Sequence, residues 1–308
     1  MLLVINGKSA GDPRLRSAVA AIRDAGHQLD VRVTWEGGDA ARYAREAVQN
    51  NYEVVIAGGG DGTVNEVTSG VISTDSPLQT AVAVVPYGTA NDFATGCGIP
   101  LENPLAALQL AATGRPIAID VGKVNEAYFV NVASGGFGAE VTANTPLEWK
   151  RMLGGAAYSL MGIITAARMT PHHCRVTFPD GKSVDGDMLV MAVGNARQCG
   201  GGQQVAPRAT LNDGLLDLMI VHDIDLGSFG ALLSELMTLG DENHQHASYA
   251  QVPSFQISSD TPMQINLDGE PMRGTSFNFQ VCAGAVRFIL GDSAPLAKSP
   301  SATSDASS

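Results

Sequence analysis

The feature that most constrains this chain is the run Val54-Val55-Ile56-Ala57-Gly58-Gly59-Gly60-Asp61-Gly62-Thr63. A short apolar, β-branched segment ends abruptly in four glycines and an aspartate, and the following Val64–Val71 is compatible with a helix. This order is typical of a parallel strand, a phosphate-binding loop and a helix N-terminus. Glycines let backbone N–H groups approach a bulky anion, and a helix N-terminus adds about half a positive charge. The run therefore predicts an α/β sheet with a nucleotide loop.

The details of the loop exclude two common nucleotide motifs. No Gly-Lys-Ser/Thr closes it, so it is not a Walker A loop, and Thr63 stands where a dinucleotide fingerprint needs its last glycine. Asp61 would repel a bare pyrophosphate, which suggests that a divalent cation lies between carboxylate and phosphates. A tight turn without a ligand is the alternative, and four glycines around an aspartate disfavour it.

Two further motifs resemble a known family. Gly59-Gly60-Asp61-Gly62-Thr63 with Asn65-Glu66 resembles the nucleotide loop of the diacylglycerol, sphingosine and NAD kinase superfamily. Pro86–Ala94 resembles P-x-G-T-x-N-D-F-A, the second signature of its lipid kinases, which NAD kinases are not expected to carry. Together with Leu267-Asp268-Gly269-Glu270, these motifs resemble the YegS-like bacterial lipid kinases over nearly the whole chain.

Composition sets limits on partners and location. The 308 residues are 44% hydrophobic and 16% charged, enough for two domains with real cores, and the net charge is −12. That charge argues against nucleic acid and against adsorption to an anionic membrane by charge alone, so a lipid substrate needs a local patch. The four scattered cysteines disfavour zinc, and no apolar stretch reaches the ~20 residues of a membrane span. We expect a cytoplasmic protein.

Residues 1–122 alternate strands and helices, which predicts a mostly parallel sheet; the resemblance implies the NAD kinase/phosphofructokinase-like form of it. Polar groups follow four predicted strands. Because ligands bind beyond the carboxyl ends of parallel strands, these groups predict a nucleotide crevice. The expected strands are 2–5, 29–35, 52–57 and 81–86, the helices 14–25, 39–49, 65–72 and 104–113, and the polar strand ends Asn6-Gly7-Lys8, Thr34, Gly58–Thr63 and Gly88-Thr89.

The resemblance implies that the strand ends bind ATP. The implied contacts are Thr34, Gly60, Asp61, Gly62, Thr63, Val64, Asn65, Glu66 and Thr89. Thr34 has the weakest support from the residues themselves, because threonine is also an ordinary strand residue.

Residues 123–291 carry many short strands and turns, which predict a mainly antiparallel, β-sandwich-like domain whose last strand could return to the first domain. We expect the active-site cleft between the two domains. Residues 150–169 are expected to form a helix that packs on the sheet or docks on lipid, and residues 292–308 a disordered tail. The expected strands are 124–133, 174–178, 188–193, 215–221, 254–258, 263–267, 277–282 and 285–290, with a helix at 226–239.

Two stretches of the second domain carry chemistry. The Asn212-Asp213-Gly214 turn fits a hairpin, but the resemblance implies a divalent cation there, held by Asp213 with the carbonyls of Thr210 and Leu215; carboxylate and carbonyl oxygens suit Mg²⁺ or Ca²⁺. At Asp268-Gly269-Glu270, a kinase could find the base that accepts the substrate hydroxyl proton. The resemblance assigns this role to the run; we favour Glu270, with Asp268 as second candidate.

These features predict an ATP-dependent kinase of a lipid hydroxyl, with phosphatidylglycerol or diacylglycerol implied as acceptor by the resemblance. Kinase chemistry on a soluble acceptor such as NAD is the alternative, and the second signature and Leu267–Glu270 oppose it. A non-catalytic nucleotide-binding regulator stays open. A dehydrogenase is disfavoured because no acidic residue is placed for the ribose. The oligomeric state stays open.

Overall fold

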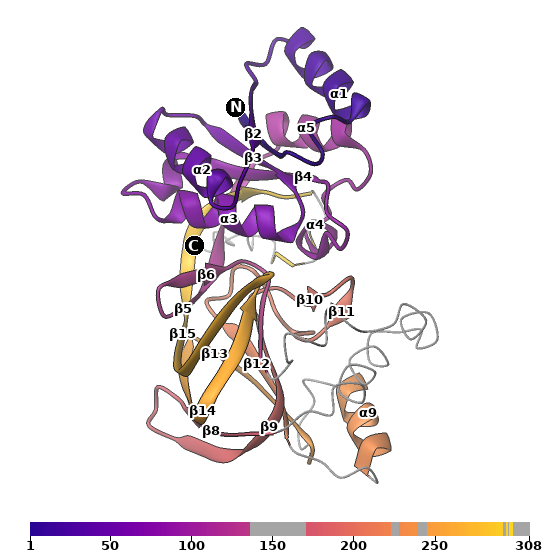
Figure 1. Ribbon diagram of the computed structural model, residues 1–308. Helices are drawn as coiled ribbons and strands as arrows, with labels where there is room; N and C mark the ends of the chain where they lie inside the picture. Colours follow the sequence, from indigo (N-terminus) through magenta and orange to yellow (C-terminus); the bar gives the residue numbers. More distant parts are fainter. Residues whose placement is uncertain (136–170, 223–227, 239–244, 292–293, 295, 298–308) are drawn as a thin grey trace, which may run out of the picture.

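The computed structural model describes residues 1–135, 171–222, 228–238, 245–291, 294 and 296–297. These residues form two domains, seen one above the other in Figure 1. The helix expected at 150–169 and most of the tail expected at 292–308 lie outside the described residues.

The first domain is built on four strands that pair in parallel in the order β4-β3-β1-β2. Each strand is followed by a helical segment, as the alternation of the sequence predicts. The strands are β1 Leu2–Asn6, β2 Asp30–Thr34, β3 Val54–Gly59 and β4 Ala81–Pro86; the helical segments are α1 Pro13–Asp24, α2 Asp39–Gln49, α3 Asp61–Ile72, the 3-10 turn η1 Pro77–Gln79, α4 Asp92–Gly96 and α5 Pro104–Thr113.

Helices cover both faces of this sheet. Leu15, Val19 and Ile22 of α1 and Leu108 of α5 pack with Leu3 and Ile56 on one face. Alanines and valines of α2 and α3 pack on the other face. Figure 1 shows α1 and α5 on one side of the strands and α2 and α3 on the other. The central strands β1, β3 and β4 are buried, so their carboxyl ends are the place where polar groups gather.

The second domain consists mainly of antiparallel strands with one helix in its described part, α9 Phe229–Met237. Its core is a cluster that includes Phe255, Phe277 and Phe279. The remaining strands of the chain are β5 Pro116–Val124, β6 Ala127–Phe129, β7 Val132–Gly135, β8 His172–Thr177, β9 Ser183–Gly194, β10 Gln198–Cys199, β11 Gln203–Gln204, β12 Leu216–His222, β13 Ala247–Val252, β14 Ser254–Leu267 and β15 Glu270–Ile289.

Strand β15 joins the two domains. It spans 20 residues, pairs antiparallel with β14 and β5, and its end pairs parallel with β4 of the first domain. Thirteen strands of the described residues therefore belong to one hydrogen-bonded sheet. In Figure 1 the yellow ribbon of β15 rises from the lower domain to the upper one. The orientation of the two domains is thus set by covalent and hydrogen-bonded continuity.

Several expected boundaries were wrong. Helix α3 begins at Asp61, so half of the expected loop is its first turn. The segments 254–258 and 263–267 are one strand with a register shift, and so are 277–282 and 285–290. The expected strand 124–133 is divided twice, by a turn at Asn125, whose φ is +50°, and by a break at Val130 and Asn131 before β7. In the expected disordered tail, Leu296 is buried and its carbonyl accepts a bond from the Leu211 N–H.

No helix in the described ranges combines the length and apolar character that crossing a bilayer requires.

Candidate active site

The four polar strand ends of the first domain lie together. A Cβ added to Gly60 would lie 2.9 Å from the Cα of Gly88, so the loops after β3 and β4 touch backbone to backbone. A Cβ on Gly7 would lie 2.7 Å from the carbonyl oxygen of Thr34, so the ends of β1 and β2 are equally close. Only glycine fits at such contacts. The rim expected from the strand ends is therefore a continuous surface of backbone groups.

The nucleotide loop is held by its own aspartate. As first residue of α3, Asp61 accepts hydrogen bonds from the backbone N–H groups of Phe93 at 3.0 Å and Asp92 at 3.3 Å. These N–H groups begin α4, so Asp61 caps the helix that the second signature forms. Asn91, the residue before α4, does not cap the helix with its side chain, which instead bonds the backbone of Gly88.

The other predicted nucleotide contacts differ in exposure. Val64 and Asn65 are buried, and the Asn65 amide donates to the Tyr128 carbonyl of β6. Their side chains therefore face the protein. Thr63 packs over Gly59, because a Cβ on that glycine would lie 2.3 Å from the Thr63 hydroxyl. Thr89 is exposed. Gly60, Gly62 and Thr89 keep their expected place on the rim.

The turn Leu267–Glu270 lies against this loop. A Cβ on Gly62 would lie 3.8 Å from the carbonyl oxygen of Asp268, so the second domain brings its carboxylates to the rim of the first. Asp268, with φ +49°, and Gly269, with φ +108°, make the tight turn between β14 and β15. Glu270 is exposed at the start of β15.

Asp268 is engaged with the backbone. Its Oδ2 accepts from the N–H groups of Val130 at 2.6 Å and Asn131 at 3.0 Å, and its Oδ1 from Val132 at 2.9 Å. Burial raises the pKa of the Asp268 carboxyl to about 6, against the opposing effect of these three donors. The carboxylate thus fixes the turn to the start of β7 and the two residues before it.

A second link between the domains comes from Asp92, which the sequence did not single out as a site residue. Its carboxylate accepts the N–H groups of Gly201 at 2.9 Å and Gly202 at 2.6 Å. The signature aspartate therefore binds a glycine loop 109 residues away. Its position inside a matched motif was the available signal, but its partner could not be known from local sequence.

Carboxylates concentrate where the domains meet. The charge of Asp61 contributes to raising the pKa of both Asp92 and Asp268, after burial as the larger cause. Burial also raises the pKa of Glu66, and the charge of Glu270 adds to it. Within the described residues, no three His, Cys, Asp or Glu side chains are placed to hold a metal by themselves. A Mg²⁺ shared between one or two carboxylates and substrate phosphates fits this oxygen-rich arrangement.

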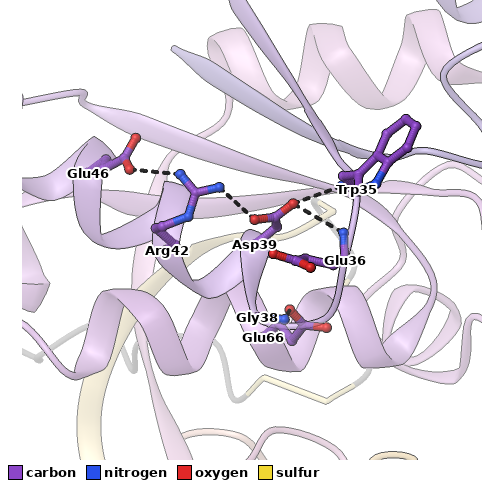
Figure 2. A network of polar contacts seen from close by, with 7 residues as sticks. All are labelled: Trp35, Glu36, Gly38, Asp39, Arg42, Glu46 and Glu66. Atoms are coloured by element: carbon purple, nitrogen blue, oxygen red, sulfur yellow. Dashed lines mark hydrogen bonds and ion pairs between the residues drawn. The ribbon is translucent and has the colours of Figure 1, made fainter.

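The loop between β2 and α2 is hydrogen-bonded to α3, the helix that follows the glycine loop and is called the nucleotide helix below (Figure 2). Gly38 donates its N–H to Glu66 Oε2 at 3.1 Å, and Asp39 Oδ2 accepts from the N–H groups of Trp35 at 2.8 Å and Glu36 at 3.2 Å. Arg42 bridges Asp39 and Glu46. Asp39 is the first helical residue of α2, after Gly38 with φ +84°, and its carboxylate holds the loop that precedes the helix.

Asp39 gives a pH-dependent prediction. The Trp35 N–H bond, then Arg42 and the Glu36 N–H, lower the pKa of the Asp39 carboxyl to about 2. Since the folded pKa lies below the unfolded value of about 3.9, its stabilisation is complete above that value and is lost as the pH falls toward 2. The melting-temperature difference between wild type and Asp39→Asn should therefore shrink as the pH falls from about 5 to about 3.

Differential scanning fluorimetry across this range would measure the difference. Asp24→Asn, at the exposed last residue of α1, is the matched control and should melt like wild type at every pH. A gap between wild type and Asp39→Asn that stays constant with pH would contradict the assignment.

The predicted cation residues Thr210, Asp213 and Leu215 share one turn. Asp213 Oδ1 accepts the N–H of Leu215 at 3.2 Å, and Gly214, with φ +73°, donates to Asp120 Oδ2 at 2.7 Å. Burial raises the pKa of Asp120, and the charge of Asp213 adds to that shift. One carboxylate and two carbonyls are a donor set suited to a hard divalent cation, and the neighbouring acids would be stabilised by one. The residues therefore fit the expected site.

A hollow of about 700 Å³ opens elsewhere, at the amino ends of β1 and β3. Its lining includes Asp30, Glu46 and Tyr52. Because parallel strands point their carboxyl ends the other way, this hollow lies away from the glycine rim, and we assign it no part in the chemistry of the rim.

Two protein families match this chain. The family described as diacylglycerol kinase catalytic domain matches residues 1–124, and the family described as YegS C-terminal NAD kinase beta sandwich-like domain matches residues 131–290. The two matches agree with the two-domain architecture. The second covers more than half of the chain.

Curated relatives and solved structures agree with these families. A protein of Chromohalobacter salexigens named "Probable lipid kinase YegS-like" is 47% identical over 285 residues, 92% of this chain and 91% of the relative. A Yersinia pestis protein of the same name is 43% identical over 298 residues, 96% and 98% of the two chains. A solved structure titled "A putative diacylglycerol kinase from Bacillus anthracis str. Sterne" is similar over 94% of this chain and 96% of its own, with 26% identity and a TM-score of 0.77.

Proposed function

The chain belongs to the YegS-like family of lipid kinases, and from that premise we propose that it transfers the γ-phosphoryl group of ATP to a hydroxyl of phosphatidylglycerol or diacylglycerol. The kinase family implies ATP and a divalent metal. One observation supports the proposal most: the turn Leu267–Glu270 of the second domain lies against Gly62 of the glycine loop. The turn that carries the proposed proton acceptor thereby lies next to the loop proposed to bind the phosphates.

We assign the general base to Glu270. Its side chain is exposed at the rim, whereas both oxygens of Asp268 already accept backbone N–H groups. The Glu270 carboxylate would take the proton of the lipid hydroxyl while the hydroxyl oxygen bonds to the γ-phosphorus. The bond between that phosphorus and the β–γ bridging oxygen breaks, and ADP leaves. Asp268 acts as a positioning residue that holds the turn.

The first domain would hold the triphosphate. Backbone N–H groups near Gly60, Gly62 and Thr63, at the N-terminus of α3, face the rim where an anion is stabilised. Thr34, Glu66 and Thr89 lie around this part of the rim. A divalent cation bound with the triphosphate would neutralise charge that develops during transfer, and Asp61, whose two oxygens accept the N–H groups of Asp92 and Phe93, holds the loop beside it. We further propose a separate structural Mg²⁺ or Ca²⁺ at Asp213, with the carbonyls of Thr210 and Leu215.

A phosphoryl-transfer screen tests the proposed function. Purified wild-type protein is incubated with γ-labelled ATP and Mg²⁺, or Ca²⁺, and with detergent-dispersed phosphatidylglycerol, diacylglycerol or soluble NAD. We expect label in the organic phase with one of the two lipids. Label only on NAD would identify a soluble acceptor, and ATP binding without any transfer would favour a nucleotide-binding regulator; either result overturns the proposal.

A further inference from the structure

Trp35 has no role in the chemistry above, and its environment is unusual. The residue is 94% exposed, and it directly follows Thr34 at the carboxyl end of β2. Among the large apolar side chains that are exposed in the described part of the chain, it is the aromatic one; the others are Val33, Leu78, Leu101 and Val184. A bare indole exposes much apolar surface that would be stabilised by a covering ligand.

The backbone that carries this indole is firmly held. The Trp35 N–H donates to buried Asp39, and the Gly38 N–H donates to Glu66 of the nucleotide helix (Figure 2). Arg42 in turn fixes the other oxygen of Asp39. Figure 2 shows the indole projecting away from this polar network. The fixed backbone presents the ring at a defined place, so the loop itself loses little conformational entropy when a ligand covers the ring.

The residues before and after Trp35 both contact segments of the predicted nucleotide rim. Thr34, the residue before it, touches Gly7 at the end of β1, and the loop after it is bonded to Glu66 of α3. The glycine loop offers backbone donors for phosphates but no apolar surface for a base. Adenine has two flat apolar faces that stack on aromatic rings. Trp35 supplies such a ring beside the predicted ATP contacts.

We propose that Trp35 is the stacking platform for the nucleobase and thereby a determinant of nucleotide specificity. This inference rests on the proposed function, since it requires the triphosphate on the glycine rim. Stacking recognises the area of a base more than its hydrogen-bonding edge, so it favours purine over pyrimidine triphosphates. The contribution of one stacked base corresponds to about 5-fold to 100-fold in affinity.

The test uses the intrinsic fluorescence of the ring. The chain has two tryptophans, Trp35 and Trp149, so a Trp149→Phe background leaves Trp35 as the sole reporter. The kcat/KM of the Trp149→Phe variant for ATP is first compared with that of wild type. With Mg²⁺ present, ATP should quench the emission with saturation, CTP should quench it less strongly, and tripolyphosphate should bind without quenching.

Variants separate stacking from other roles. Trp35→Ala should bind ATP about 5-fold to 100-fold more weakly, and tripolyphosphate within about two-fold of wild type, because only the base loses its partner. Trp35→Phe should restore most of the ATP affinity. Leu78→Ala, which removes another exposed apolar side chain, is the control and should not change either affinity.

Three results would overturn the inference. Unchanged ATP affinity of Trp35→Ala in an otherwise active enzyme would leave the proposed function intact and refute stacking. Unchanged ATP affinity with lost association to phosphatidylglycerol vesicles would make Trp35 a membrane contact instead. Failure of wild type to bind ATP at all would refute both the proposed function and the platform.

Discussion

Replacing Glu270 by glutamine should lower kcat for lipid phosphorylation by about 10²-fold to 10⁴-fold, the range that a positioned general base supplies. Glutamine keeps the size of the side chain but cannot take the hydroxyl proton. The dissociation constant for ATP should stay within about two-fold of wild type, because Glu270 is assigned to the acceptor and not to the nucleotide. Steady-state transfer with the accepted lipid and calorimetric ATP titration measure the two quantities.

The thermal stability of Glu270→Gln is the internal control. Glu270 is exposed, so its replacement should leave the melting temperature unchanged. A variant that keeps more than about a tenth of the wild-type kcat would contradict the assignment of Glu270 as base.

Replacing Asp268 by alanine should, unlike the Glu270 replacement, cause a large loss of thermodynamic stability. The three N–H groups that its carboxylate accepts belong to Val130, Asn131 and Val132, all of which are buried. A buried donor left without a partner costs up to about 3 kcal/mol, and the costs of neighbouring donors do not add in full. We therefore expect the free energy of unfolding to fall by about 2–5 kcal/mol. Urea denaturation measures this change.

A graded series makes the Asp268 prediction sharper. Asp268→Asn keeps one acceptor oxygen, but its amide NH₂ then faces at least one of the same backbone N–H groups. Its stability should therefore lie between those of wild type and Asp268→Ala. Equal stability of all three proteins would show that these bonds do not hold the turn, and the positioning role of Asp268 would have to be abandoned.

The first domain could be predicted well because its signals are local. Apolar runs that end in glycine or polar residues predicted the segments that form β1 to β4, and helical spacing at Leu15, Val19 and Ile22 predicted α1. The two-domain architecture is confirmed by the family matches. Boundaries failed where two structures are locally compatible: Asp61-Gly62-Thr63 can continue a loop or begin a helix, and the structure uses it as a helix start.

The second domain was harder because its strands depend on distant partners. Polar residues at Ser259-Asp260-Thr261 suggested a break in β14, but pairing with β8 and β15 on either side keeps the strand continuous. Strand β13 was missed because its Ala247–Val252 sequence is weakly apolar, and it forms by pairing with β12.

The candidate site shows the same limit. Sequence motifs predicted the rim from Thr34 to Thr89 and the turn with Glu270, and the structure brings these segments together. The roles stay predictions until the kinetic tests are done. Motifs could not reveal the contact of Asp268 with Val130–Val132, which lie 136 to 138 positions earlier in the chain. Nor could they reveal the contact of Asp92 with the glycine loop near Gly201. Such contacts depend on tertiary structure and leave no periodic signal.

The path of β15 has a consequence for biosynthesis. Its last residues lie beside β4, and Val286 and Phe288 belong to the apolar core of the first domain. During translation, residues 1–122 leave the ribosome long before this strand exists, so β4 waits with an uncovered edge and an incomplete core. A truncated chain that ends before Glu270 would keep the edge of β4 unpaired and the core of the first domain incomplete. A chimaera of two related kinases would therefore need the first domain and β15 from the same parent.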